Sequence, residues 1–168
     1  MTKYVLSIVV DNNPNVMARV SSMFARRRFN MTSVTAAQTS DPNVSVITIV
    51  TEGDAHVLDQ AIKQTYKLQE VRSITLLPRN ESLLCETVMI RLAFDEKNIS
   101  LIKDIVEVYR AKIIDLTSSS MVVQLTGKPS KIDGFLEVMS PYHVLEMCRS
   151  GVIGMPRGSQ SDWWMNKA

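Results

Sequence analysis

The sequence is poor in the residues that most often hold metals or form covalent bonds. It has only two cysteines and two histidines among its 168 residues. Cys85 and Cys148 lie far apart in the sequence, which supports neither a disulfide framework nor a zinc-binding pattern. Two unpaired thiols favour a reducing compartment. With no basic partner nearby in sequence, both cysteines are predicted to be buried small hydrophobic residues.

Long hydrophobic runs are also missing. No stretch approaches the ~20 apolar residues of a membrane-spanning helix. The apolar run in MTKYVLSIVV is too short for a secretory signal. Hydrophobic residues make up 45% of the chain and charged residues 21%, values typical of a globular protein with a buried core. We therefore expect a soluble, cytoplasmic protein without membrane association.

Catalytic motifs are absent as well. The sequence contains no glycine-rich phosphate loop, no paired-histidine motif and no nucleophile elbow. His56 and His143 are isolated and predicted to lie at the surface. The adjacent carboxylates Asp95 and Glu96 fall just before a helix, where capping is the favoured interpretation. Residues 118–120 form a serine turn without an accompanying base, so nothing here supports an enzyme and no catalytic residue is assigned.

Aromatic residues make up only 6% of the chain, which argues against RNA binding. RNA-recognition sheets stack bases on aromatic side chains of their central strands. Here the first strand offers Tyr4 alone and the strand over 44–51 has no aromatic ring. The basic run at 26–28 falls at a helix C-terminus, where cations stabilise the helix dipole. With a net charge of only +2, no nucleic-acid partner is predicted.

The residues that are present show a regular alternation of strand and helix patterns. The first half contains β-rich runs at 4–10, 31–39, 44–51 and 70–77. Between them lie two amphipathic stretches, whose apolar stripes begin at Val16 and at Val57. This order is β-α-β-β-α-β. The same order recurs with strands at 86–94, 112–117, 120–127 and 143–151, and helices whose apolar stripes begin at Ile99 and Ile132.

The predicted fold is therefore α+β, with two ferredoxin-like βαββαβ units in tandem. We assign residues 1–77 to the first domain, 78–83 to a connector, 84–158 to the second domain and 159–168 to a loosely ordered tail. Both faces of the strand over 44–51 carry apolar residues, although helices should cover only one face of the sheet. The other face then needs a second copy or a neighbouring unit as its cover, and we expect an oligomer.

The stretch NNPNVM, residues 12–17, prepares a helix N-terminus unusually well. Free backbone amides and the positive end of the helix dipole favour a carboxylate there. Asn12 and Asn30 add side-chain amides that can donate and accept, and Asn30 could reach this turn from a neighbouring copy. A free amino acid fits this chemistry, while simple turn and cap roles for the asparagines fit it equally well.

The sequence from VVDNNPNVMARV through SVITIVTEGD resembles the start of the small regulatory subunits of acetolactate synthase (acetohydroxyacid synthase). The resemblance continues through LDQAIKQTYKLQEVRSI and AKIIDLTSSSMVVQLTGKPSKIDGFLEVM to EMCRSGVIGMPRG, near residue 158. It implies that the first unit is an ACT domain, an amino-acid-sensing module, and that two ACT domains associate side by side in a homodimer.

The resemblance also implies a function. Small subunits of this kind bind and activate a thiamine-diphosphate-dependent catalytic subunit and confer feedback inhibition by valine in branched-chain amino acid synthesis. Thiamine diphosphate, magnesium and flavin would belong to that catalytic partner, and no cofactor is expected on this chain. The residues that match the family's valine contacts are Asn12, Asn15, Val16 and Met17, with Asn30 and Met31 opposite.

Two positions depart from the family pattern, which has glycine at both. Asn15 tolerates a left-handed backbone better than most residues, but its side chain could fill volume that the effector needs. Arg28 would cost on the order of 1 kcal/mol if its backbone is left-handed. We expect a folded protein with a weakened valine response. The alternative is a stand-alone ACT-type amino-acid sensor that regulates another protein.

Overall fold

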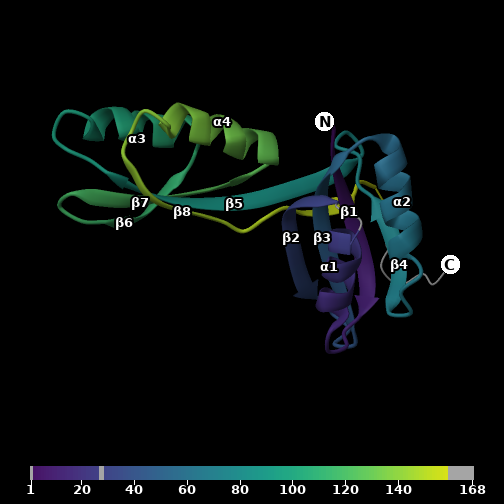
Figure 1. The fold of residues 1–168 in the computed structure, drawn as a ribbon. Helices are drawn as coiled ribbons and strands as arrows, with labels where there is room; N and C mark the ends of the chain where they lie inside the picture. The colour runs from purple at the N-terminus through teal and green to yellow at the C-terminus, as the bar shows by residue number, and fades with distance from the viewer. Residues whose placement is uncertain (1, 27–28, 159–168) are drawn as a thin grey trace. The chain divides into compact units, whose positions relative to one another are not determined.

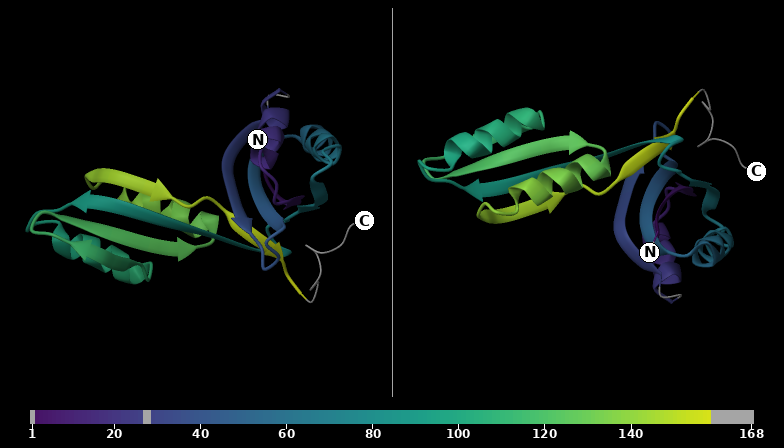
Figure 2. Two further views of the ribbon diagram at one scale, coloured as in Figure 1. Left: turned by 90° about the horizontal axis from the view of Figure 1, so that it is seen from below. Right: turned by 90° about the horizontal axis from the view of Figure 1, so that it is seen from above.

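The computed structural model of the chain describes residues 2–26 and 29–158. These residues form two compact units, and the boundary between them falls between Leu83 and Leu84, within strand β5. Each unit is a βαββαβ arrangement (Figures 1 and 2). The first sheet has four strands and the second has five, because a short additional strand near residue 155 also pairs with β5. The predicted fold class, two ferredoxin-like units in tandem, is confirmed.

The first unit contains six elements that follow the predicted order closely. They are β1 (Thr2–Asp11), α1 (Val16–Arg26), β2 (Asn30–Gln38), β3 (Val44–Gly53), α2 (Ala55–Thr65) and β4 (Val71–Leu76). The strand order in the sheet is β2-β3-β1-β4, so β2 and β4 are the edges. Its core joins the helices to one face of the sheet, where Leu6 pairs with Ile49 and Ile8 with Ile47.

The opposite face of this sheet is also buried along its central strands, β1 and β3. Val9, Ser7 and Thr48 on that face are at most 3% exposed. Part of the cover comes from the chain's own later residues. The Val152 N–H donates to Ser33 Oγ at 3.2 Å, and Thr35 Oγ1 donates to the Val152 carbonyl at 2.8 Å. At this position the cover therefore comes from residues of the same chain, which group with the first unit.

The second unit contains β5 (Ser82–Ala93), α3 (Ile99–Val108), β6 (Lys112–Leu116), β7 (Ser120–Gly127), α4 (Pro129–Met139) and β8 (Val144–Arg149). The strand order is β6-β7-β5-β8, and both helices lie on one face of the sheet (Figure 1). Its core comes from alternate residues of β5 and β7 and from the apolar stripes of α3 and α4, including Ile102 and Phe135.

The chain then returns to the first unit. Residues from Val152 onward group with that unit, whereas the sequence-based division placed 152–158 in the second domain. Strand β9 (Ile153–Pro156) pairs with β5, and the Arg157 N–H donates to the Glu81 carbonyl at 2.8 Å. No apolar periodicity marks this stretch in the sequence. It forms a strand because it pairs with residues about seventy positions earlier in the chain. The predicted tail, 159–168, lies outside the described residues.

Candidate functional site

A pocket of about 420 Å³ lies in the first unit where β1 ends and α1 begins. One wall is the turn itself, with Asn12, Asn13 and Asn15, and the start of the helix, with Val16 and Met17. The other wall comes from the sheet. Its lining residues are Val10, Asp11, Ala36, Ala37, Gln38, Ser45 and Ile47. The pocket thus combines a polar turn with an aliphatic floor.

The N-terminus of α1 opens onto this pocket. The first helical hydrogen bond runs from the Arg19 N–H to the Asn15 carbonyl at 3.0 Å. The amides of Met17 and Ala18 precede that bond and belong to the group of helix-start amides without an intrahelical acceptor. Together with the positive end of the helix dipole, they suit the carboxylate of a small ligand.

Asn15 lies in the turn that directs these amides toward the pocket. Its φ is +71°, within the left-handed region that favours glycine and that asparagine tolerates better than most residues. The positive φ expected at this position from the family's glycine is therefore present. Unlike glycine, Asn15 carries a side chain, and the residue lines the pocket. The other departure, Arg28, lies outside the described residues.

Asn12 has a structural task in addition to lining the pocket. Its Nδ2 donates to the Pro42 carbonyl at 2.9 Å, and its backbone N–H donates to the Asn43 carbonyl at 2.8 Å. These bonds tie the end of β1 to the turn between β2 and β3. The Asn12 side-chain nitrogen is therefore directed to the hairpin, and the side-chain oxygen is the atom left for a ligand.

Asn30 and Met31 do not line this pocket. Both stand at the start of β2, whereas Ala36, Ala37 and Gln38 line the pocket at its end. At about 3.4 Å per residue the two ends of β2 are roughly 27 Å apart. Met31 packs against the core, and Asn30 is exposed. A single chain thus brings together Asn12, Asn15, Val16 and Met17 from the predicted set, and a role for the other two requires a second copy.

Sequence reasoning did not identify the sheet residues of the pocket. Gln38 and Ser45 lie far from the helix start along the chain, and they reach it because β3 lies between β2 and β1. The sequence did predict the hairpin around residue 41 that carries these residues. It did not predict the strand order, which places Ala36 and Ile47 beside the helix.

Ion pairs brace the turn behind the pocket. The Arg72 Nε donates to Asp11 Oδ1 at 2.6 Å, which joins the end of β1 to β4. Arg19 on α1 pairs with Glu70, whose backbone carbonyl accepts the Asp11 N–H at 2.8 Å. Two bases and two acids therefore fix α1, β1 and β4 together, which keeps the backbone of the turn in place.

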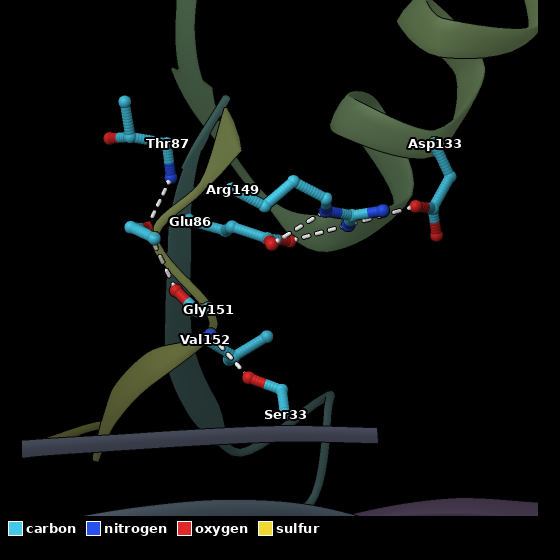
Figure 3. A network of polar contacts seen from close by, with 8 residues as sticks. Ser33, Glu86, Thr87, Asp133, Arg149, Gly151 and Val152 are labelled. Atoms are coloured by element: carbon cyan, nitrogen blue, oxygen red, sulfur yellow. Dashed lines mark hydrogen bonds and ion pairs between the residues drawn. The ribbon is translucent and has the colours of Figure 1, made fainter. Parts of the chain in front are cut away.

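A second polar network lies at the end of β8 in the second unit (Figure 3). The Arg149 guanidinium donates to both carboxylate oxygens of buried Glu86 at 2.7 and 2.6 Å, and to Asp133 at 3.1 Å. The hydrogen bonds to Glu86 raise the pKa of Arg149 further above its ordinary value. In the next residue, Ser150 Oγ accepts the Thr87 N–H at 3.0 Å. This network orders the chain just before it enters the first unit.

The isolated candidates have ordinary surroundings. His56 lies within 2.9 Å of Gln60 on the surface of α2, and His143 is exposed. Asp95 Oδ1 accepts the N–H groups of Lys97 and Asn98, both at 3.0 Å, and so closes the turn before α3, whose own N-cap residue is Asn98.

The prediction for the cysteines is wrong in part. Cys148 is exposed because it stands on edge strand β8, and Cys85 is only half-buried. Among residues 2–26 and 29–158, no group of three or more His, Cys, Asp or Glu could hold a metal ion. None of the helices in that part of the chain is long and apolar enough to cross a membrane.

Comparison with known proteins finds two matching families. Residues 6–73 match the AHAS small subunit-like ACT domain, and residues 85–158 match the family described as the small subunit of acetolactate synthase. The probable acetolactate synthase small subunit of Archaeoglobus fulgidus is 34% identical over 158 residues, which is 94% of this chain and 99% of that protein.

Other relatives agree. The small subunit of acetolactate synthase isozyme 3 from Escherichia coli is 34% identical over 93% of this chain and 96% of its own length. The crystal structure of the acetolactate synthase small subunit from Thermotoga maritima superposes with a TM-score of 0.85 at 32% identity, covering 95% of this chain and 99% of that one.

Proposed function

Because the chain belongs to the family of acetolactate synthase small subunits, we propose that it is a non-catalytic regulatory subunit that binds and activates the catalytic subunit in the cytoplasm. The observation that carries this proposal is the near end-to-end match to small subunits in both sequence and fold. The reaction served would be the acetolactate synthesis that leads to valine, leucine and isoleucine. Thiamine diphosphate, magnesium and flavin are assigned to the catalytic partner.

The pocket at the start of α1 is the proposed effector site. Its helix-start amides suit a carboxylate, the Asn12 side-chain oxygen suits an ammonium group, and the aliphatic residues Val10, Ala36 and Ile47 suit a branched side chain. A volume of about 420 Å³ accommodates a free amino acid of this kind. Valine is the effector that the family resemblance implies.

The site is proposed to be completed by a second copy. Strand β2 is an edge of its sheet, so its outer side is free to pair with the same strand of another chain. In an antiparallel pair centred on Val34, Asn30 of one copy lies opposite Gln38 of the other. Asn30 and Met31 would then reach the pocket of the second copy, although they lie far from the pocket of their own chain.

Reconstitution with the catalytic subunit of the same organism tests the proposal. We expect the two chains to co-purify and acetolactate formation to rise severalfold over the catalytic subunit alone, while the small chain alone gives no turnover. Failure to bind the catalytic subunit, with amino-acid binding retained, would favour a stand-alone sensor instead.

The effector part is tested by titrating valine into the reconstituted enzyme. We expect inhibition that is weaker than in an Asn15→Gly variant, because the glycine removes a side chain from the pocket wall. Equal inhibition of the two enzymes would show that the Asn15 side chain does not limit binding.

A further inference from the structure

Strand β6 (Lys112–Leu116) is an edge of the second sheet, and all five of its residues are exposed. It pairs with β7 on one side only. An edge strand presents a row of backbone donors and acceptors to the surroundings and is a template for pairing with another strand.

The apolar core of the second unit is open at this edge. Ile113 pairs with Val123 and Leu116 with Met121, and both β7 partners are fully buried beneath the helices. Ile113 and Leu116 stand on the same face but are 36% and 56% exposed. The neighbouring Ile114 is 48% exposed. The helices therefore leave the end of the core uncovered, and an apolar surface remains along β6.

The sequence of β6 is complementary to itself. The run Lys-Ile-Ile-Asp, residues 112–115, has a base at one end, an acid at the other and two isoleucines between them. When a second copy is laid antiparallel with residue 112 opposite residue 115, each lysine meets an aspartate and each Ile113 meets an Ile114. A two-fold axis relates the copies, as in most homodimers.

A bulge in β6 makes this complementarity usable. Residues three apart in a regular strand point to opposite faces. In β6 the register shifts between Ile113 and Asp115, so that Lys112 stands opposite Gln124 and Asp115 opposite Val122. Those β7 residues are two apart, so Lys112 and Asp115 share one face. That is the face without helices, whereas Ile113 lies on the helix side with the core.

Both charges are available to a partner. Lys112 has no ion-pair partner among the residues that the structure describes, and its side chain lies in an exposed position. Asp115 is half-exposed, and its contact with Arg91 is long, at 3.5 Å. Arg91 makes a second contact of the same length with Glu146. Arg91 thus has a second acid when Asp115 turns outward.

We propose that β6 pairs antiparallel with β6 of a second copy, with Lys112 of each chain against Asp115 of the other. The pairing satisfies the free edge, covers the exposed isoleucines and extends the sheet of the second unit into a second chain. It rests on the β6 edge alone and is independent of the proposed effector site.

Carbodiimide cross-linking of the full-length protein tests this pairing, because the reagent joins a lysine amine to a nearby carboxylate. Two single variants, Lys112→Asp and Asp115→Lys, are prepared separately. The first has only acids at positions 112 and 115 and the second only lysines, so neither can form the cross-link alone. We expect a cross-linked peptide between position 112 of one variant and position 115 of the other when they are mixed, and none in either sample alone.

The unaltered protein provides an independent measurement. Unlabelled and ¹⁵N-labelled chains are mixed while dilute, concentrated and cross-linked. We expect Lys112–Asp115 peptides of mixed isotope, and we expect Lys112→Arg to abolish them, because arginine keeps the charge but does not react. Cross-links confined to chains of one isotope, or found at these positions only to the catalytic subunit, would overturn the proposal, as would an unreactive mixture of the two variants.

Discussion

At the scale of single residues, Asn15 shows how a departure from a family pattern is tolerated. A positive φ places most side chains in conflict with their own backbone, and glycine avoids the conflict because it has no Cβ. Asparagine is the usual second choice. The φ of +71° therefore preserves the turn that aims the first amides of α1 into the pocket. The change affects the volume of the pocket more than the fold.

Substitutions at Asn15 separate these two effects. Asn15→Ala is expected to lower the free energy of unfolding by about 1 kcal/mol, because alanine tolerates the left-handed backbone poorly. Asn15→Gly is expected to stay within about 0.5 kcal/mol of the unaltered chain. Thermal melts of the three proteins without ligand check this. A melt of the alanine variant equal to that of the glycine variant would contradict a left-handed residue 15.

Glu86 is the second informative residue. Its side chain is 3% exposed, and the bidentate contact with Arg149 compensates its charge. Two isolated charges would be costly to bury, and the pair is maintained because each oxygen of the carboxylate receives a donor. Arginine stays protonated in proteins in any case, and the hydrogen bonds to Glu86 raise the pKa of Arg149 further above its ordinary value.

Removal of one partner should therefore be costly. Arg149→Met is expected to destabilise the protein by about 3 kcal/mol, because it leaves the Glu86 carboxylate buried without a counter-charge. Arg91→Met is the matched control, since Arg91 makes only 3.5 Å contacts to exposed acids, and its loss should cost less than about 1 kcal/mol. Urea denaturation of both variants measures the difference, and equal losses would contradict this account.

At the scale of elements, strand β2 has three structural roles. Its end lines the pocket, its outer side is free, and its Ser33 and Thr35 hydroxyls hold the backbone of Val152. The hydroxyls replace the partners that a neighbouring strand would give to Val152. The segment that follows β8 is thereby fixed on the face of the first sheet that the helices do not cover.

Loss of these hydroxyls should leave the backbone N–H and C=O of Val152 without hydrogen-bond partners. In the double variant Ser33→Ala and Thr35→Val we expect the stability to fall by about 2 kcal/mol, because a buried N–H and C=O lose their partners. The exchange rate of the Val152 amide hydrogen should rise with it. Thr32→Val is the control on the same strand, since Thr32 Oγ1 makes only a long contact of 3.4 Å. Unchanged exchange in the double variant would refute the role of the hydroxyls.

At the scale of the whole molecule, the chain repeats one topology and uses the two copies differently. The first unit has a pocket at a helix start and a sheet whose two central strands are buried on both faces. The second unit keeps its core open along β6. We infer that the first unit senses the effector and that both units contribute edges to assembly.

Ligand binding to the whole chain can be measured by a thermal melt. A ligand that binds only the folded state stabilises it by about 2.7 kcal/mol at 100 times its dissociation constant, which is several degrees for units of this size. We expect valine to raise the melting temperature of the Asn15→Gly variant more than that of the unaltered chain, with smaller effects from leucine and isoleucine. No shift in either protein with any of the three would exclude the pocket as their site.

The elements were predictable where local pattern and final structure agree. The apolar stripe containing Val20 and Phe24 predicts α1, and the apolar run through Ile47 and Ile49 predicts β3 as a strand with apolar residues on both faces. Strand β9 was missed because its four residues, Gly154 among them, show no periodicity of their own. The exposure of Cys148 was missed because an edge position depends on strand order.

The sequence by itself determined the two βαββαβ units, the turn chemistry of NNPNVM and the absence of recognisable catalytic motifs, because each depends on residues close together in the chain. Only the tertiary structure decided that Gln38 and Ser45 share a pocket with Asn15, that Asn30 does not, and that the chain returns from the second unit to cover the first sheet. These features depend on strand order and on contacts between residues far apart in the sequence, which local periodicity does not encode.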